Sequence, residues 1–263
     1  MIENIILGSL QGIFEWLPVS SEAVLVLAQT HLFGGGEAYE MISRALFFHF
    51  GTFLAAVIYF RQEIYDLLLT CLNYKKAENN NKSILKFLFI TTAISGGLGV
   101  LILVLIESLS ETISLTGQIV TIVIGVLLIG TGLLQLKSDK FGIKEAGQVN
   151  NIDSVLLGVF QGLAALPGFS RSGLTVSALL LRKFKEEDAL RLSFLMSLPI
   201  VLFGNIILNF SSLSFNLPAL VGLLSAFIFG LGTIHGLLKL AKRFNFGYFV
   251  IGFGLITVFL AFI

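Results

Sequence analysis

The chain has 263 residues, of which 56% are hydrophobic and 13% charged, and its formal net charge is +1. Soluble domains carry about 25% charged residues, so this composition indicates a protein embedded in lipid. The single cysteine excludes an internal disulfide, and the sequence lacks both a basic stripe for nucleic acid and a GxxxxGK[ST] phosphate loop.

Six segments are expected to cross the membrane as helices. Each lacks Lys, Arg, Asp and Glu, and most approach the roughly 20 residues that a transmembrane helix needs. In chain order they are residues 45–60, 87–106, 115–136, 192–208, 217–238 and 244–263. The first is the shortest, but Arg44 and Arg61 at its ends can extend toward the membrane surfaces.

Two further apolar segments, residues 7–27 and 157–181, carry polar side chains, and we expect each to form a re-entrant helical hairpin. Both read LGxxQG, then an apolar stretch, then Leu-Pro, then serines. The first helix of each should end near Pro18 or Pro167, because the residue before a proline is pushed out of helical conformation. A second helix should then begin behind serine caps.

Most of the 17 Lys and Arg residues fall in four groups, which the positive-inside rule places in the cytoplasm, with the loops 107–114 and 209–216 outside. These positions agree with six spans only if neither hairpin crosses the membrane. We therefore expect an all-α integral protein of the plasma membrane, with six transmembrane helices and two opposed re-entrant hairpins in an inverted-topology repeat. Residues 1–263 would form a single membrane domain, with repeat halves at about 1–136 and 151–263.

The second hairpin carries the sharpest indication of a binding site. Arg171 lies at its expected tip, far from the cationic loops. A central arginine costs about 2.5–3.5 kcal/mol to insert and usually marks function. With the hydroxyls of Ser170, Ser172 and Thr175 and a helix N-terminus, it predicts a phosphate cradle. The alternative is an ordinary N-cap whose arginine pairs with a structural carboxylate.

The first hairpin supplies an acidic group. Gln11 and Glu15 are four residues apart and therefore share one face of a helix. An unpaired carboxylate in an apolar stretch would protonate, so Glu15 needs a partner. That partner is either Arg171 from the facing tip or a divalent cation, for which Gln11 and Glu15 are the candidate ligands.

Ser21 and His49 are candidate catalytic side chains. Ser20, Ser21 and Glu22 stand where the second helix should begin, and capping alone would account for all three. Ser21 becomes a candidate nucleophile if the fold brings it to Arg171. His49 lies within an expected span, where an imidazole usually faces the interior of the bundle.

The motifs Gln11-x-x-x-Glu15, Leu17-Pro-Val-Ser-Ser21 and Pro167-Gly-Phe-Ser-Arg-Ser-Gly-Leu-Thr175 occur together in this chain. With them it resembles, over nearly its whole length, the undecaprenyl-diphosphate phosphatase family of the bacitracin-resistance type. The resemblance implies hydrolysis of a polyprenyl diphosphate to the monophosphate, which recycles the lipid carrier of cell-envelope glycan synthesis. It also implies a divalent cation, Mg²⁺ or Ca²⁺, and the site residues Gln11, Glu15, Ser21, Ser170, Arg171, Ser172 and Thr175. The expected partners are this lipid and membrane lipids but not nucleic acid; a homodimer is left open.

One position departs from that family. Bacterial members usually place a Gly-His pair after the first serines, and the histidine is a proposed catalytic base. Here the aligned residues are Ala23 and Val24, and Val24 cannot move a proton. We expect His49 to take that role. The departure resembles an archaeal or divergent branch, so the carrier is either undecaprenyl or dolichyl.

In the expected mechanism, Arg171, the helix N-terminus behind it and a metal held by Glu15 bind the diphosphate. The attacking group is either Ser21 or a water activated by Glu15 or His49, and the residues do not decide between them. The alternative function is a polyprenyl-phosphate transporter or flippase that performs no hydrolysis, since secondary transporters also bind anions between inverted hairpins. A third possibility is that the protein is an inactive relative, but the intact arginine motif argues against it.

Overall fold

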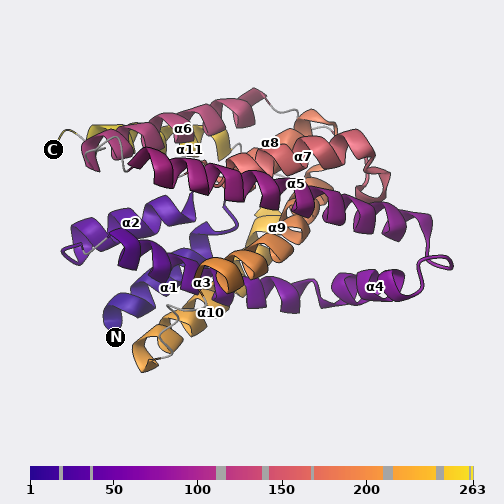
Figure 1. Cartoon of the computed structure of the whole chain (residues 1–263), viewed down its shortest axis with the longest axis horizontal. Helices are drawn as coiled ribbons and strands as arrows, with labels where there is room; N and C mark the ends of the chain where they lie inside the picture. The colour runs from indigo at the N-terminus through magenta and orange to yellow at the C-terminus, as the bar shows by residue number, and fades with distance from the viewer. Residues whose placement is uncertain are drawn as a thin grey trace.

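The computed structural model describes the whole chain except residues 18–19, 36–37, 111–116, 138–141, 167–168, 210–215, 241–245, 261 and 263. The described part is helical, and its only β-type pairing is an isolated bridge between Lys144 and Phe184. In chain order the elements are α1 (Ile2–Phe14), α2 (Ser21–Leu32), α3 (Ala38–Tyr59), α4 (Arg61–Leu72), α5 (Asn79–Ser110), α6 (Gly117–Lys137), the 3₁₀ helix η1 (Ala146–Gln148), α7 (Asn151–Leu163), α8 (Arg171–Leu181), α9 (Glu186–Asn209), α10 (Leu217–Leu240) and α11 (Phe246–Leu260) (Figure 1).

Three of the described helices, α5, α9 and α10, are long and apolar enough to cross a membrane. A fourth candidate is the pair α3 and α4, which meets the same criterion together but is bent by 80° at the break. The described apolar parts of α6 and α11 are shorter, at Gly125–Leu134 and Val250–Phe259. The expectation of an all-α membrane protein is therefore confirmed, while the count of six spans stays a prediction. The expected outer loops 107–114 and 209–216 lie largely outside the described residues.

Each expected hairpin segment contains two short helices separated by a non-helical stretch. α1 contacts α2, and α7 contacts α8. The first helices end at Phe14 and Leu163, each four residues before the proline at which the sequence predicts the break. Pro18 and Pro167, which we expected to end the first helices, lie outside the described residues.

Serines cap the second helix of both hairpins in the same way. Ser20 is extended and its side chain accepts a hydrogen bond from the backbone N–H of Ala23 at 3.3 Å. Ser170 is also extended and accepts from the N–H of Gly173 at 3.1 Å. Because the caps match, Ser21 and Arg171 occupy the same position, the first residue of the following helix.

The glycines of the repeated LGxxQG motif allow the hairpins to pack closely on longer helices. A Cβ atom on Gly8 would lie 2.0 Å from the carbonyl oxygen of Gly222, so α1 and α10 touch backbone to backbone. A Cβ atom on Gly158 would lie 2.8 Å from the Cβ of Ile94, where α7 packs on α5. Only glycine permits such close approach.

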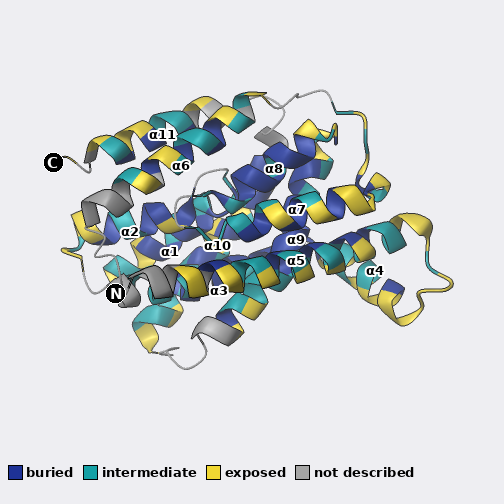
Figure 2. Ribbon diagram, turned by 45° about the horizontal axis from the view of Figure 1, so that its top comes forward, coloured by how far each residue is buried: buried dark blue, intermediate teal, exposed yellow. Residues whose placement is uncertain are grey.

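Burial separates an inner from an outer layer. Figure 2 shows that buried residues dominate α8 and α9 at the centre of the molecule, while α4 and the outer faces of α5 and α11 carry many exposed ones. Large apolar side chains are among those exposed, including Phe89 on α5 and Phe259 on α11. Such faces are suited to contact with lipid.

Candidate functional site

Side chains from four helices converge on Glu15, which lies in the turn after α1 and is only 5% exposed. Its Oε2 accepts hydrogen bonds from Gln11 Nε2 and Ser21 Oγ, each at 2.8 Å. His49 Nε2 lies 3.1 Å from the same oxygen. The other oxygen, Oε1, accepts from Arg171 Nη2 in an ion pair. We refer to these five residues as the Glu15 cluster.

The cluster confirms that the two hairpin segments meet. Of the two partners expected for Glu15, the structure supplies the guanidinium of Arg171. Ser21, whose role depended on this meeting, donates to the carboxylate that Arg171 also binds. His49 on α3 faces the same group. The structure thus brings together the four residues predicted to be catalytic, and their roles stay predictions.

The hydrogen bonds of His49 fix the arrangement of its ring. Nδ1 lies 2.8 Å from the carbonyl oxygen of Ala45. A carbonyl only accepts, so Nδ1 carries a hydrogen and Nε2 faces Glu15 Oε2, which is itself an acceptor unless protonated. One proton is therefore shared between the ring and the carboxylate. No hydrogen bond joins the imidazole of His49 to the hydroxyl of Ser21, so Glu15 is the group that contacts the candidate nucleophile.

Arg171 keeps one half of its guanidinium free. Its side chain is 17% exposed, and Nη2 is bound to Glu15. Nη1 is buried and has no hydrogen-bond partner in the described part of the chain. A buried donor without a partner costs about 1–3 kcal/mol, so this atom is suited to an oxygen that the protein does not supply. A phosphate oxygen is the ligand that an arginine fork matches best.

The three hydroxyls predicted to bind phosphate are bonded to the protein in this structure. Ser170 caps α8, and Ser172 Oγ donates to the carbonyl oxygen of Leu17 at 2.7 Å, which ties the second hairpin to the first. Thr175 Oγ1 donates to the carbonyl oxygen of Arg171 at 2.8 Å. These bonds hold the start of α8 in place, and a role in phosphate binding stays a prediction.

Ser193 on α9 is a neighbour of the site that the sequence did not reveal. Its Oγ lies 2.7 Å from Thr175 Oγ1, and both residues are fully buried. This contact links α9 to the helix that carries Arg171. A serine within an apolar span was the available signal, but serines of this kind also occur wherever membrane helices pack closely.

Gln11 and Glu15, the predicted metal ligands, are differently suited to a cation. Gln11 Oε1 is buried without a partner and is an available oxygen ligand. Glu15 is not, because both of its oxygens already accept hydrogen bonds, one of them from a cation. Among the residues that the structure describes, no three His, Cys, Asp or Glu side chains come together as a metal site. A resident metal ion on Glu15 therefore does not fit this arrangement.

Glu22 adds a second carboxylate beside the cluster. It follows Ser21 at the start of α2 and is exposed. The charges of His49, Glu15 and Arg171 act on its carboxyl group. From the sequence we attributed Glu22 to helix capping. Its position directly after the candidate nucleophile was the feature that could have indicated its proximity to the site.

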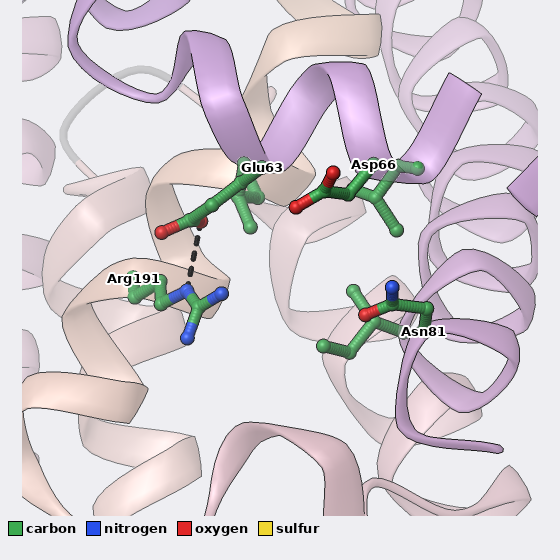
Figure 3. Close-up of a pocket in the computed structure, with 7 residues that line it drawn as sticks. Glu63, Asp66, Asn81 and Arg191 are labelled. Atoms are coloured by element: carbon green, nitrogen blue, oxygen red, sulfur yellow. Dashed lines mark hydrogen bonds and ion pairs between the residues drawn. The ribbon is translucent and has the colours of Figure 1, made fainter. Parts of the chain in front are cut away.

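A separate polar pocket lies between α4, α5 and α9 (Figure 3). There Arg191 Nε donates to Glu63 Oε2 at 2.8 Å, and Asp66 and Asn81 complete the polar wall. A hollow of about 890 Å³ adjoins it and shares Asn81 and Arg191. Neither contains a member of the Glu15 cluster, so both are distinct from the candidate site.

Comparison with known proteins identifies the family. The family model for "Bacitracin resistance protein BacA" matches residues 4–258. A protein of Methanococcoides burtonii named "Undecaprenyl-diphosphatase" is 42% identical over 262 residues, which cover 97% of this chain and 96% of that protein. Proteins of the same name from Methanothrix thermoacetophila and Haloarcula marismortui are 37% and 39% identical, over 98% and 92% of this chain and 95% and 90% of their own lengths. The chain belongs to the bacitracin resistance protein BacA family.

Proposed function

We propose that this protein is a polyprenyl diphosphate phosphatase, which hydrolyses an undecaprenyl-type diphosphate to the monophosphate and inorganic phosphate and so recycles the lipid carrier. The names of its relatives support hydrolysis over transport. The observation that carries the proposal is the free Nη1 of Arg171 beside the hydrogen bond from Ser21 to Glu15. An anion-binding donor is thereby placed next to a hydroxyl nucleophile and a base.

In the proposed reaction, Ser21 Oγ attacks the terminal phosphorus and its proton passes to Glu15 Oε2. The bond from this phosphorus to the bridging oxygen breaks, and the electron pair leaves with the polyprenyl monophosphate. Water then cleaves the phosphoserine, which releases inorganic phosphate and restores the hydroxyl. The 2.8 Å bond between Ser21 and Glu15 favours this route over direct attack by water.

His49 acts through Glu15 in this scheme. With the shared proton on its ring, Glu15 is ionised and can accept the proton of Ser21. His49 is then a positioning residue that orients the carboxylate and balances its charge, and does not itself deprotonate the serine. The contact of Nε2 with Glu15 supports this assignment.

Arg171 binds the terminal phosphate and stabilises the charge that develops on it, an effect worth about 10²- to 10³-fold in rate where single donors have been removed. Ser170, Ser172 and Thr175 hold the helix start that presents this arginine. We propose that the free N–H groups at that helix start add to the phosphate site.

A divalent cation, Mg²⁺ or Ca²⁺, is proposed to accompany the substrate and to neutralise charge on its phosphates. Gln11 Oε1 is an oxygen that the protein could offer to it.

For the arrangement in the membrane, we propose six crossings and two opposed hairpins in the plasma membrane. Helix packing supports an inverted repeat, because α1 packs on α10 of the second half and α7 packs on α5 of the first half. The exposed apolar faces of α5 and α10 would contact lipid, or a second copy of the chain if a homodimer forms.

The decisive experiment measures phosphate release from a polyprenyl diphosphate by the purified protein, with Mg²⁺ and with a chelator. We expect release with Mg²⁺, and a loss of about 10²-fold or more in Arg171→Ala. Arg44→Ala is the matched control, because that arginine pairs with Glu3 away from the Glu15 cluster. An Arg171→Ala protein that retains most activity would refute the phosphate site.

Two further measurements separate the alternatives. Acid quenching followed by mass spectrometry should detect phosphate on Ser21, whereas attack by water would leave the serine unmodified. Lipid exchange between vesicles without release of phosphate would instead establish the transport function.

A further inference from the structure

Ser193 takes no part in the reaction proposed above, yet it lies two hydrogen bonds from the backbone of Arg171. Its Oγ is 2.7 Å from Thr175 Oγ1, and Thr175 Oγ1 is 2.8 Å from the carbonyl oxygen of Arg171. Ser193 and Thr175 are both fully buried. Water therefore does not compete for either hydroxyl, and each must be satisfied by the protein.

The inventory of donors fixes the direction of this chain of hydrogen bonds. A threonine hydroxyl has one hydrogen, and a carbonyl oxygen only accepts. If Thr175 donated to Ser193, its oxygen would face the carbonyl oxygen of Arg171 at 2.8 Å with no hydrogen between them. Thr175 therefore donates to that carbonyl, and the hydrogen in its contact with Ser193 comes from Ser193. The chain runs from the hydroxyl of Ser193 through that of Thr175 to the backbone of Arg171.

Helix α9 holds Ser193 in place from its opposite side. Arg191, two residues earlier, donates from Nε to Glu63 Oε2 on α4 at 2.8 Å (Figure 3). Two residues along an α-helix are turned by about 200°, so Arg191 and Ser193 point in nearly opposite directions. At this level α9 is tied to α4 on one face and to α8 on the other. Ser193 therefore presents its hydroxyl from a fixed support.

The backbone that receives this chain carries the arginine of the candidate site. Arg171 is the first residue of α8, and its buried Nη1 has no partner in the described part of the chain. On the other side of the helix start, Ser172 Oγ donates to the carbonyl oxygen of Leu17. A long side chain can present its donor accurately only if its backbone is held, and a binding group needs to be placed within about 0.5 Å.

We propose that Ser193 is a positioning residue for the phosphate-binding arginine. As a hydrogen-bond donor it orients the hydroxyl of Thr175 onto the carbonyl oxygen of Arg171, and so fixes the start of α8 beneath the guanidinium. Ser193 does not touch the substrate. The inference rests on the proposed function, since it requires a phosphate at Arg171.

The first test compares two buried serines of the same helix in the phosphate-release assay. In Ser193→Ala, kcat/KM should fall about tenfold, because a donor misplaced by 1 Å can cost about 10²-fold and the loss of this contact misplaces it only in part. Ser197→Ala is the matched control. Its hydroxyl is also buried, but it donates to the carbonyl oxygen of Phe194 in α9 itself. It should lose similar stability and keep wild-type kcat/KM, so a merely structural effect would appear in both variants.

The second test asks whether Ser193 acts through Thr175. Thr175→Val removes the hydroxyl that receives the hydrogen of Ser193, so it should lower kcat/KM at least as much as Ser193→Ala. Addition of Ser193→Ala to Thr175→Val should then cause no further loss. Affinity for farnesyl methylenediphosphonate, whose P–C–P linkage the proposed reaction cannot cleave, should fall several-fold in Ser193→Ala and remain unchanged in Ser197→Ala.

Three results would overturn the inference: wild-type kcat/KM in Ser193→Ala, an equal loss in Ser197→Ala, or losses that multiply when Ser193→Ala and Thr175→Val are combined. If the wild type releases phosphate in these cases, the proposed function survives and only the role of Ser193 is lost. A wild-type protein that neither releases phosphate nor binds the analogue refutes both.

Discussion

At the scale of single residues, Glu15 is held by Gln11 on its own hairpin helix and by side chains from α2, α3 and α8. A buried carboxylate is tolerated only where charges and hydrogen bonds replace the water it has lost. The same donors therefore stabilise the fold and prepare the chemistry. Removal of any one of these donors should therefore change how the remaining donors bind the Glu15 carboxylate.

His49 provides the first test of this coupling. In His49→Ala, Glu15 loses one hydrogen bond and the proton that it shares with the ring, so kcat should fall about 10- to 100-fold. KM should change little, because Arg171 remains in place. His49→Gln keeps a hydrogen-bond donor and should recover part of the loss in the phosphate-release assay.

His235→Gln is the control for the histidine series, since this residue is exposed on α10 and contacts Tyr59 outside the cluster. It should retain wild-type kcat. Unchanged activity in His49→Ala would remove His49 from the mechanism and leave Glu15 to act without it.

The hydroxyl pair of Thr175 and Ser193 permits a second test, by a double-mutant cycle. Each of Thr175→Val and Ser193→Ala should lower the free energy of unfolding by about 1 kcal/mol, because a buried hydrogen bond is lost. Their combination should cost less than the sum, with a coupling of roughly 1 kcal/mol. Denaturant titration in detergent measures these energies.

Ser225→Ala serves as the matched control in this cycle. Within the described part of the chain, its hydroxyl bonds only to the carbonyl oxygen of Val221 in its own helix. When Ser225→Ala is combined with Thr175→Val, the loss in the free energy of unfolding should equal the sum of the two single losses. A Thr175–Ser193 pair that is equally additive would show that the 2.7 Å contact contributes nothing to stability.

Sequence reasoning found the residues of the Glu15 cluster because each is polar in an apolar stretch, where a polar group needs a partner. It could not rank Glu22 or Ser193, because each has an ordinary local explanation. Glu22 is suited to a helix start and Ser193 to helix packing. Their relation to Arg171 arises only from the tertiary fold.

At the scale of elements, close packing explains why the two hairpins share the letters LGxxQG. The glycine after the leucine is Gly8 in one copy and Gly158 in the other, and each faces a neighbouring helix at very short range. The motif therefore reflects helix packing as well as chemistry. In the second copy, Gln161 donates hydrogen bonds to Ser95 and to the carbonyl oxygen of Met196. Among the described residues it has no acidic partner, whereas Gln11 in the first copy bonds to Glu15.

Gly8→Ala should destabilise the protein by about 1–3 kcal/mol or more, because the new methyl group would overlap the backbone of Gly222 and push α1 away from α10. Gly97→Ala on α5 is the control. Nothing lies within 4 Å of its added Cβ, so the higher helix propensity of alanine should make it neutral or slightly stabilising. Thermal unfolding in detergent compares the two, and equal midpoints would contradict the close contact.

The sequence predicted both hairpin breaks but not α4. We expected a cytoplasmic loop to follow Arg61, and the structure has a helix there, turned by 80° from α3. This helix exposes Tyr65, Leu68 and Leu72. Its apolar side chains are too few to register as a span, which is why hydropathy overlooked it.

At the scale of the whole molecule, helices far apart in the chain depend on each other. The first helix of each hairpin packs on a long helix distant in sequence, α1 on α10 and α7 on α5, and α6 packs on α11. A fragment that contained only the first or only the last part of the chain would therefore leave its hairpin without the helix it packs against. The sequence could indicate the repeat from its letters, but this exchange of partners depends on contacts between residues far apart in the chain.

Orientation in the membrane supplies the last prediction. Cys71 is the single cysteine, is exposed on α4, and follows Arg61 on the side that the cationic groups assign to the cytoplasm. A membrane-impermeant maleimide should therefore label wild-type protein in inside-out vesicles and not in right-side-out ones. In a Cys71→Ser background, Leu32→Cys at the exposed end of α2 should show the reverse pattern, because the first hairpin should enter from outside. Labelling of both cysteines from the same side would contradict opposed hairpins, since Leu32 and Cys71 are separated by the expected first crossing through α3.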